Sequence, residues 1–374
     1  MFSNRLEWSL EPNDLAKLLA AKRRDGVRIL DLTQSNPTQA GIEYPPELLD
    51  ALCAPAALRY EPTPWGLDIA REAAAAEHQV DVARVMITAS TSESYSYLFK
   101  LLCSPGDNVL VPKPSYPLFE FLAKLESVEL RQYPLHYTGT WQIDFDAMER
   151  LADARTRAVL LVNPNNPTGS YLKQAELPKL IDLCVRRQFA IVSDEVFSCY
   201  GFGDAGDGVV RTLADVTEVL TFCLNGLSKM GGLPQMKAGW MILGGPQKPR
   251  QRAAELLELI ADTFLSVSAP IQHALPEMLR LTRAVRERIQ QRTAHNLEYL
   301  QARCAPLHVE GGWYAVLPVD RDEYDLVLDL VREDDVLVQP GFFYDFEEGN
   351  HLILSLLTGE ADFRAGADEL LARV

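Results

Sequence analysis

The chain has 374 residues, of which 47% are apolar and 24% are charged, and its formal net charge is −16. This length exceeds what one growing core supports, so we expect a folded protein with two domains. The negative charge disfavours nucleic acid and anionic membranes as partners. Because the sequence has no long apolar run, we expect no membrane span and no signal peptide. The six cysteines include no Cys-x-x-Cys pair, which favours the reducing cytoplasm.

The first predicted element is an amphipathic helix in residues 11–26, EPNDLAKLLAAKRRDG. Leu15, Leu18 and Leu19 fall on one face of this helix at the helical spacing. A predicted strand, ILDLTQSNPT in residues 29–38, follows it.

Short apolar runs alternate with helical ones from residue 85 onward, which is typical of a chain of βαβ units. Ligands of such parallel sheets bind beyond the carboxyl ends of the strands, so the residues that follow each strand are candidates for a site. The predicted strands are 85–89, 108–112, 158–162, 189–194, 218–223 and 240–244, and 175–188 is predicted as a helix.

Two of these strands are followed by residues that suit a phosphate and a flat ring. Ser90, Thr91 and Ser92 follow the strand at 85–89 and begin a helical pattern. They could bind a phosphate at the helix N-terminus, or Ser90 could be an ordinary cap. Tyr116 stands between prolines in KPSYPLF and could pack locally or cover a ring.

The next three strands are followed by amides, a carboxylate and an amine. NPNNPTG, residues 163–169, holds more turn-forming and amide residues than a plain connection requires. Asp194 ends the strand at 189–194, and Lys229 follows the strand at 218–223 in LNGLSKMGG. A phosphate cup, an aromatic ring, amides, a carboxylate and a lysine form the set that pyridoxal phosphate needs, because the lysine forms its Schiff base and the carboxylate pairs with its pyridinium nitrogen.

Over nearly its whole length the chain resembles the pyridoxal phosphate-dependent aminotransferases of class I/II, which have fold type I and belong to the aspartate aminotransferase superfamily. The resemblance rests on NPNNPTG (163–169), SDEV (193–196) and LSK (227–229), in that order. It implies an α/β fold: a large domain, residues 46–274, with a mostly parallel seven-stranded sheet flanked by helices, and a smaller α+β domain from both chain ends, residues 1–45 and 275–374.

The same resemblance assigns roles to individual residues. Lys229 would form the Schiff base and shuttle the proton, Asp194 would pair with the pyridinium nitrogen, and Asn166 would donate to the phenolic oxygen. The other implied cofactor contacts are Ser90, Thr91, Ser92, Tyr116, Ser228, Tyr60 and Lys237, with Lys237 in place of the usual arginine, whose two-pronged geometry a lysine lacks. No metal ligands are predicted.

Further implied contacts concern the partner subunit, the phosphate and the substrate. Tyr60 would reach the phosphate of a neighbouring subunit, so a homodimer with shared sites is expected. Ser266 and Ser268 would lie near the phosphate or the subunit boundary, and Gly231 and Gly232 would let the backbone approach the phosphate. The candidate substrate contacts are Ser35 and Asn36, although Asn36 could instead form a turn before Pro37.

Two positions depart from the family pattern. Ile353, in HLILSLL, stands where the family usually has the arginine that binds the substrate α-carboxylate, and Arg5 and Lys113 are weak substitutes for it. Phe197 stands where a tyrosine usually donates to the phenolic oxygen, so the pKa of the lysine–cofactor imine is expected to be higher than with a tyrosine.

Three functions are compatible with these residues. The leading hypothesis is an aminotransferase that moves an amino group between an amino acid, or a related amine, and a 2-oxo acid. The alternative is a lyase, a decarboxylase or a condensing synthase on the same fold, which the missing arginine keeps open. The third is a cofactor-binding sensor without catalysis.

Overall fold

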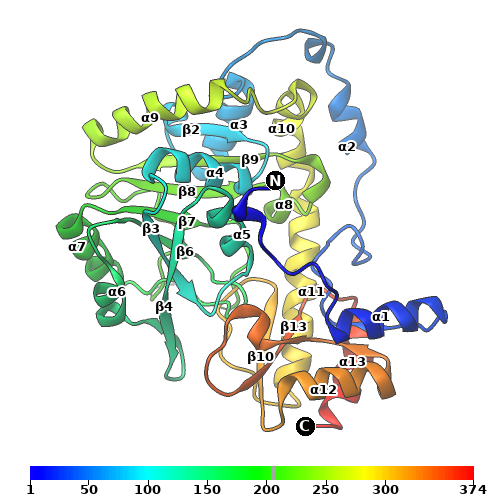
Figure 1. Cartoon of the computed structure of the whole chain (residues 1–374). Coiled ribbons are helices and arrows are strands. Elements are labelled where there is room, and N and C mark those ends of the chain that lie inside the picture. Colours follow the sequence, from blue (N-terminus) through cyan, green and yellow to red (C-terminus); the bar gives the residue numbers. More distant parts are fainter. Residues whose placement is uncertain (204–207) are drawn as a thin grey trace.

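The computed structural model describes residues 1–203 and 208–374. Its main feature is an eight-stranded sheet in the order β2-β9-β8-β7-β6-β3-β4-β5 (Figure 1). The strands are β2 (Val85–Thr88), β3 (Asn108–Lys113), β4 (Glu129–Tyr137), β5 (Trp141–Ile143), β6 (Thr156–Val162), β7 (Ala190–Asp194), β8 (Thr221–Gly226) and β9 (Gly239–Gly244).

The strand directions bring the predicted polar residues to one edge of the sheet. β8, β7, β6, β3 and β4 run parallel, and β9 is antiparallel to both of its neighbours, β2 and β8. The carboxyl ends of β2, β3, β6, β7 and β8 therefore share one edge. The mostly parallel α/β fold is confirmed.

The expected number of strands, seven, is wrong by one. β5 has three residues and forms an antiparallel hairpin with β4, which places it at the edge of the sheet. Neither β4 nor β5 is among the six strands that the apolar runs predict between residues 85 and 244. The sequence of β4, ELRQYPLHY, is largely polar and contains Pro134, as expected of a strand that is half exposed near an edge.

Helices cover both faces of the large sheet because alternate residues of each strand point to opposite sides. Along β6, Leu160 and Val162 pack against α4, α5 and α9, whereas Val159 and Leu161 pack with α3, α6, α7 and α10. The helices on the two faces are α3 (Asp68–His78), α4 (Thr91–Leu102), α5 (Leu118–Leu125), α6 (Phe145–Leu151), α7 (Leu177–Arg187), α9 (Gln247–Asp262) and α10 (Ala269–Leu281).

Within the described residues no helix is long and apolar enough to cross a membrane.

A second, smaller region joins the two ends of the chain. β1 pairs in parallel with β11, and β13 lies between β10 and β12. Leu15 and Leu32 pack in one buried cluster with the C-terminal strands and helices, and Figure 1 shows α11 running from the large sheet to this region. Its elements are α1 (Asp14–Arg24), β1 (Leu30–Asp31), α11 (Arg283–Gln301), β10 (Tyr314–Val319), α12 (Glu323–Asp329), β11 (Val336–Leu337), β12 (Gln339–Pro340), β13 (Asn350–Ser355) and α13 (Glu360–Leu371).

The limits between the two regions, near residues 45 and 275, remain our proposal. Leu48 in α2 (Glu47–Asp50) packs in the core of the large sheet, in keeping with a start at residue 46. α10 spans the second limit, and its Leu275 and Met278 pack in that same core. This packing favours a second limit after α10.

Candidate active site

A cavity of about 280 Å³ lies at the carboxyl edge of the large sheet, where Asp194 ends β7 and Gly226 ends β8. The structure thus brings together predicted residues that lie more than 200 positions apart in the sequence, from Ser35 to Lys237. The predicted site residues that line it are Ser35, Ser90, Thr91, Ser92, Tyr116, Asn166, Asp194, Ser228, Lys229 and Lys237.

Lys229 lies in the short helix α8 (Leu227–Met230), directly after β8. Its Nζ is 5.0 Å from the ring centre of Trp313 and 5.5 Å from that of Phe197. Burial lowers the pKa of Lys229 to about 8, although the Asp194 carboxylate acts in the opposite direction. A substantial fraction of this amine is therefore neutral near pH 8, as a nucleophile requires.

Asp194 is the acid of the cavity. Its carboxylate accepts hydrogen bonds from the Tyr95 hydroxyl at 3.1 Å and from the Val196 N–H at 3.2 Å. Burial raises its pKa to about 6, while these two hydrogen bonds and the charge of Lys229 lower it. A buried carboxylate with this environment would be stabilised by a cationic partner, such as a protonated ring nitrogen.

The N-terminus of α4 forms another part of the wall. Ser90 caps the helix by accepting the Glu93 N–H at 3.3 Å, so its ordinary capping role is present. The Glu93 carboxylate also accepts the N–H of Ala89, the residue before the cap, at 2.6 Å, which fixes the entry of the chain into the helix. Thr91 and Ser92 line the cavity in the first turn, where backbone N–H groups have no partner within the helix. This turn can therefore receive an anion.

Two glycines allow close backbone contacts in the wall of the cavity. A Cβ on Gly239 would lie 3.1 Å from the backbone carbonyl carbon of Ser90, and one on Gly226 would lie 2.8 Å from the Ala238 carbonyl oxygen. A side chain at either position would therefore push the wall of the cavity apart.

The prediction that Gly231 and Gly232 approach the phosphate is wrong. Neither lines the cavity, and Gly232 has a φ of +64° in the turn after α8. Its carbonyl accepts the Tyr44 hydroxyl at 2.6 Å, and a Cβ there would meet Val285 and Ile289 of α11. Gly232 therefore allows the turn to pack against α11.

The asparagines of NPNNPTG divide between structure and site. Asn163 donates to the Val210 carbonyl at 2.7 Å, and the Asn165 side-chain carbonyl accepts the Thr168 hydroxyl at 2.9 Å. Asn166 lines the cavity, and its buried side-chain carbonyl has no hydrogen-bond partner within the described part of the chain. Its side-chain NH2 group also has no hydrogen-bond partner there, so this donor is available to an acceptor on a bound group.

Tyr60, Ser266 and Ser268 do not line the cavity. They line a neighbouring groove, which Lys237 borders as well, and Tyr60 is 77% exposed. Lys237 therefore stands between the two hollows. The Ser266 hydroxyl donates to the Glu93 carboxylate at 2.6 Å, so Ser266 supports the cap of α4.

The proposed substrate contact of Asn36 is not supported. The Asn36 side-chain carbonyl accepts hydrogen bonds from the Thr38 N–H at 3.1 Å and the Thr38 hydroxyl at 2.8 Å, and Asn36 does not line the cavity. This is the alternative of a turn at Pro37. Ser35, its neighbour, does line the cavity.

Several wall residues were missed from the sequence. Tyr95 follows Thr91 by one helical turn, so the (i, i+4) spacing on α4 could have indicated it. Tyr314 begins β10 more than 80 residues after Lys229, and the sequence offers no signal for its position. The remaining missed wall residues are Leu118, Phe119, Leu122, Val162, Val196, Gly226, Pro234 and Ala238.

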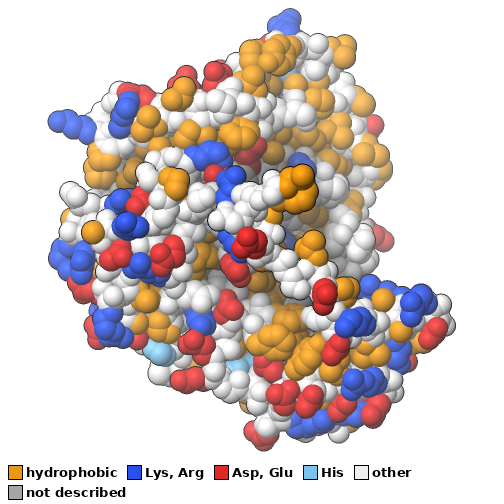
Figure 2. All heavy atoms as spheres, in the orientation of Figure 1, with side chains coloured by type: hydrophobic (Ala, Val, Ile, Leu, Met, Phe, Trp, Pro, Cys, Tyr) orange, Lys and Arg blue, Asp and Glu red, His pale blue; other side chains and the backbone are white. Residues whose placement is uncertain are grey.

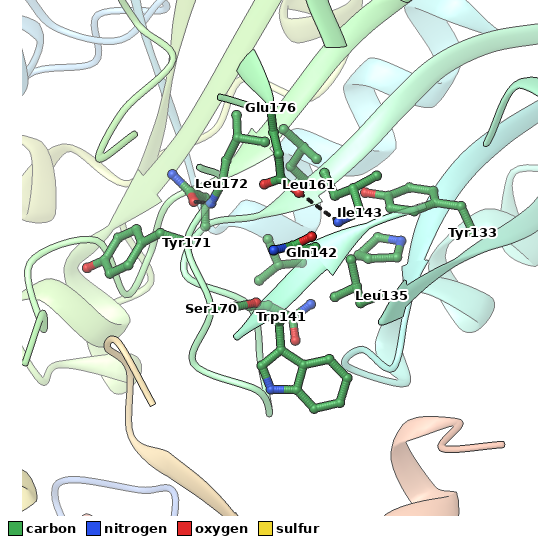
Figure 3. Close-up of a pocket in the computed structure, with 14 residues that line it drawn as sticks. Tyr133, Leu135, Trp141, Gln142, Ile143, Leu161, Ser170, Tyr171, Leu172 and Glu176 are labelled. Carbon is green, nitrogen blue, oxygen red and sulfur yellow. Dashed lines mark hydrogen bonds between the residues drawn. The ribbon is translucent and has the colours of Figure 1, made fainter. Parts of the chain in front are cut away.

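A separate small hollow, of about 30 Å³, lies under the β4–β5 hairpin (Figure 3). Glu176 points into it and accepts the Ile143 N–H at 2.7 Å and the Lys173 N–H at 2.8 Å. The hollow has room for about one water molecule. Glu176 thus fastens the hairpin to the start of α7, and we assign this hollow a structural role.

Comparisons with known proteins agree with the geometry of the cavity. The profile of the family described as aminotransferase class I and II matches residues 29–356. Glutamate-pyruvate aminotransferase AlaA of Haemophilus influenzae is 29% identical over 87% of this chain and 86% of its own length, and alanine aminotransferase of Mycobacterium tuberculosis is 28% identical over 92% and 85%.

Solved structures show the same fold. An aminotransferase from Escherichia coli superposes with a TM-score of 0.86 at 25% identity, covering 100% of this chain and 97% of its own. Alanine aminotransferase from Pyrococcus furiosus gives 0.87 at 21% identity, covering 100% and 99%. The leading hypothesis is thereby confirmed over the lyase, decarboxylase, synthase and sensor alternatives. The chain belongs to the class I and II aminotransferases of fold type I, enzymes that transfer amino groups.

Proposed function

We propose that this aminotransferase binds pyridoxal phosphate in the 280 Å³ cavity and holds it covalently on Lys229. One observation carries the proposal: a buried amine with a lowered pKa shares its cavity with a buried carboxylate, Asp194, and with an amide, Asn166, that the protein leaves unpartnered. These groups match the cofactor's aldehyde, ring nitrogen and phenolic oxygen.

Each residue would have a distinct task. When bound, the cofactor supplies an aldehyde and a ring that withdraws electrons from the reacting carbon. Lys229 would move the proton at that carbon, and Asp194 would keep the ring nitrogen protonated. The first turn of α4 and Lys237 would bind the phosphate, and Tyr116 would cover the ring. The rings of Phe197 and Trp313 would keep water from the Lys229 amine.

The proposed substrates are a small amino donor and a 2-oxo acid acceptor. The proposed location is the cytoplasm, and the support is that the six cysteines form no disulfide within the described residues; two of them, Cys184 and Cys223, are buried.

We further propose a homodimer in which each subunit completes the partner's site. Leu49, Leu58 and Tyr60 are 65%, 93% and 77% exposed. They belong to the segment around α2, and Figure 2 shows hydrophobic side chains gathered over that side of the molecule. Apolar surface of this kind is typical of a protein interface. Tyr60 would then reach the partner's phosphate.

The first test follows one half-reaction. The reconstituted enzyme is mixed with an amino donor in the absence of an oxo acid, and the released cofactor is identified. We expect one equivalent of pyridoxamine phosphate per site. Recovery of unchanged pyridoxal phosphate together with ammonia and an oxo acid would contradict the proposal, because it is the outcome of an elimination.

The second test addresses the shared site by mixing two inactive variants, Lys229→Ala and Tyr60→Ala. A mixed dimer holds one site with both residues intact if Tyr60 acts across the interface, so we expect about a quarter of wild-type activity to return after subunit exchange. No recovery, in a mixture shown to contain mixed dimers, would place Tyr60 in its own subunit's site.

A further inference from the structure

The position of Ile353 decides what the cavity can offer a substrate. Along β13, Leu352 and Leu354 pack into the core of the small region, and Ile353 points to the opposite face. There it is fully buried in an apolar cluster with Phe197 and Tyr314. These two residues also line the cavity, so the apolar cluster is continuous with its wall.

The candidate replacements for an arginine at this position lie elsewhere. Arg5 is on the surface and donates to the Leu125 carbonyl at 2.8 Å. Lys113 pairs with Glu347 and lines a separate groove. Among the described residues, the cations that line the cavity are Lys229 and Lys237. Our proposed function assigns both of them to the cofactor.

The rest of the wall is neutral or acidic. α5 contributes Leu118, Phe119 and Leu122, and the available hydroxyls belong to Ser35 and Tyr314. A substrate carboxylate here would find no free charged partner among the described residues of this chain, so it would add no charge-assisted binding energy in either half-reaction.

We propose that the amino donor of this enzyme is a primary amine whose reacting carbon carries only uncharged substituents, such as an arylalkyl amine, an alkyl amine or an amino acid amide. This inference rests on the proposed function. The donor carbon loses its hydrogen and its nitrogen and becomes the carbonyl of an aldehyde or ketone, a two-electron oxidation. The electrons, a proton and the amino group pass to the aldehyde carbon of the cofactor. The donor nitrogen would replace the Lys229 nitrogen on that carbon, which frees the Lys229 amine, and one water would be consumed when the product C=N bond is hydrolysed.

The test compares donors that differ only at the carboxylate. Single turnovers of the holoenzyme are followed by cofactor absorbance with L-phenylalanine, L-phenylalaninamide and 2-phenylethylamine, and the series is repeated with leucine and alanine and their matched amides and amines. We expect the amide and the amine to reach a kcat/KM at least equal to that of the acid. A preference for the acid of 10³ or more would overturn the inference, whichever subunit supplies the cation.

The two proposals fail in different ways. If no donor of any series converts the cofactor to its amine form, the proposed function fails and the inference falls with it. If acids alone convert it, transamination stands and the inference about the donor is overturned.

A pair of variants tests the role of Ile353 itself. Ile353→Arg should shift the acid-to-amide ratio of kcat/KM toward the acid by at least tenfold, because a guanidinium pairs with a carboxylate. Ile353→Met, which keeps an apolar side chain of similar volume, should retain the wild-type ratio. An unchanged ratio in a folded, cofactor-loaded Ile353→Arg protein would overturn the assignment. The wild-type comparison decides the inference if that variant does not fold.

Discussion

The two sides of the cavity differ in how they use polar groups. On the side formed by the large sheet, Asp194 and Lys229 are buried ionisable groups with shifted pKa values, and Asn166 has an unused amide. On the side that borders the small region, Phe197 and Tyr314 continue into an apolar cluster that contains Ile353. Under our proposals, the wall with the ionisable groups would hold the cofactor, and the apolar wall would select the substrate.

Removal of the amine should have the largest effect. We expect Lys229→Ala to lower the rate of amino transfer by about 10⁴-fold or more, because it removes both the covalent attachment and the proton carrier. Stopped-flow measurement of the half-reaction checks this. Lys237→Gln, at the rim of the same cavity, is the matched control and should mainly weaken cofactor binding. Equal rate losses in the two variants would contradict the division of roles.

Asp194→Asn should have the next largest effect. The amide cannot pair as an anion with a protonated ring nitrogen, so we expect kcat/KM to fall by roughly 10²–10³, or about 3–4 kcal/mol. Cofactor should still bind through Lys229 and α4. A variant that turns over at nearly the wild-type rate would show that the Asp194 carboxylate has no part in the chemistry.

The unusual pKa of Asp194 also predicts how the stability of the apoprotein depends on pH. The pKa is about 6 in the folded protein and 3.8 ordinarily, so the folded state binds more protons between these values. The stability contributed by this group is complete below about pH 4 and is lost as the pH rises through about 6, by about 3 kcal/mol. Urea unfolding of wild type and Asp194→Asn should show this loss only in the wild type. Parallel pH profiles would contradict it.

Tyr95→Phe should have the smallest effect. It removes one hydrogen bond to Asp194, worth about 1.5–3 kcal/mol for a charged acceptor, and the pKa of Asp194 should rise further. In the urea experiment, the pH-dependent loss of stability should therefore extend to pH values above 6. Tyr299→Phe removes a comparable hydrogen bond, to Asp368 at 2.8 Å on the surface, and should leave both the window and cofactor affinity unchanged.

The wall formed by the large sheet could be predicted because its residues follow strands that the sequence pattern indicates. Asp194, Asn166 and Lys229 each lie at or after an apolar strand, and parallel strands bring their carboxyl ends to one edge. Asn36 was harder, since the same side chain can serve a substrate or a turn, and only the fold shows that Thr38 uses it.

The wall near the small region could not be predicted, because long-range packing builds it. Tyr314 and Ile353 come from β10 and β13, and they pack in one cluster with Phe197, which lies more than 100 positions earlier in the chain. The mistaken role of Gly232 has the same origin: its neighbours in α11 are more than 50 residues away.

The central claim is that Lys229 carries the cofactor. Borohydride reduction of the reconstituted enzyme, followed by proteolysis and peptide mass mapping, tests it directly, because reduction fixes the C=N bond between lysine and cofactor. We predict a single pyridoxyl adduct on the peptide that contains Lys229, and no adduct in the Lys229→Ala protein. An adduct on Lys237 or on any other lysine of the wild-type protein would contradict the assignment of the site.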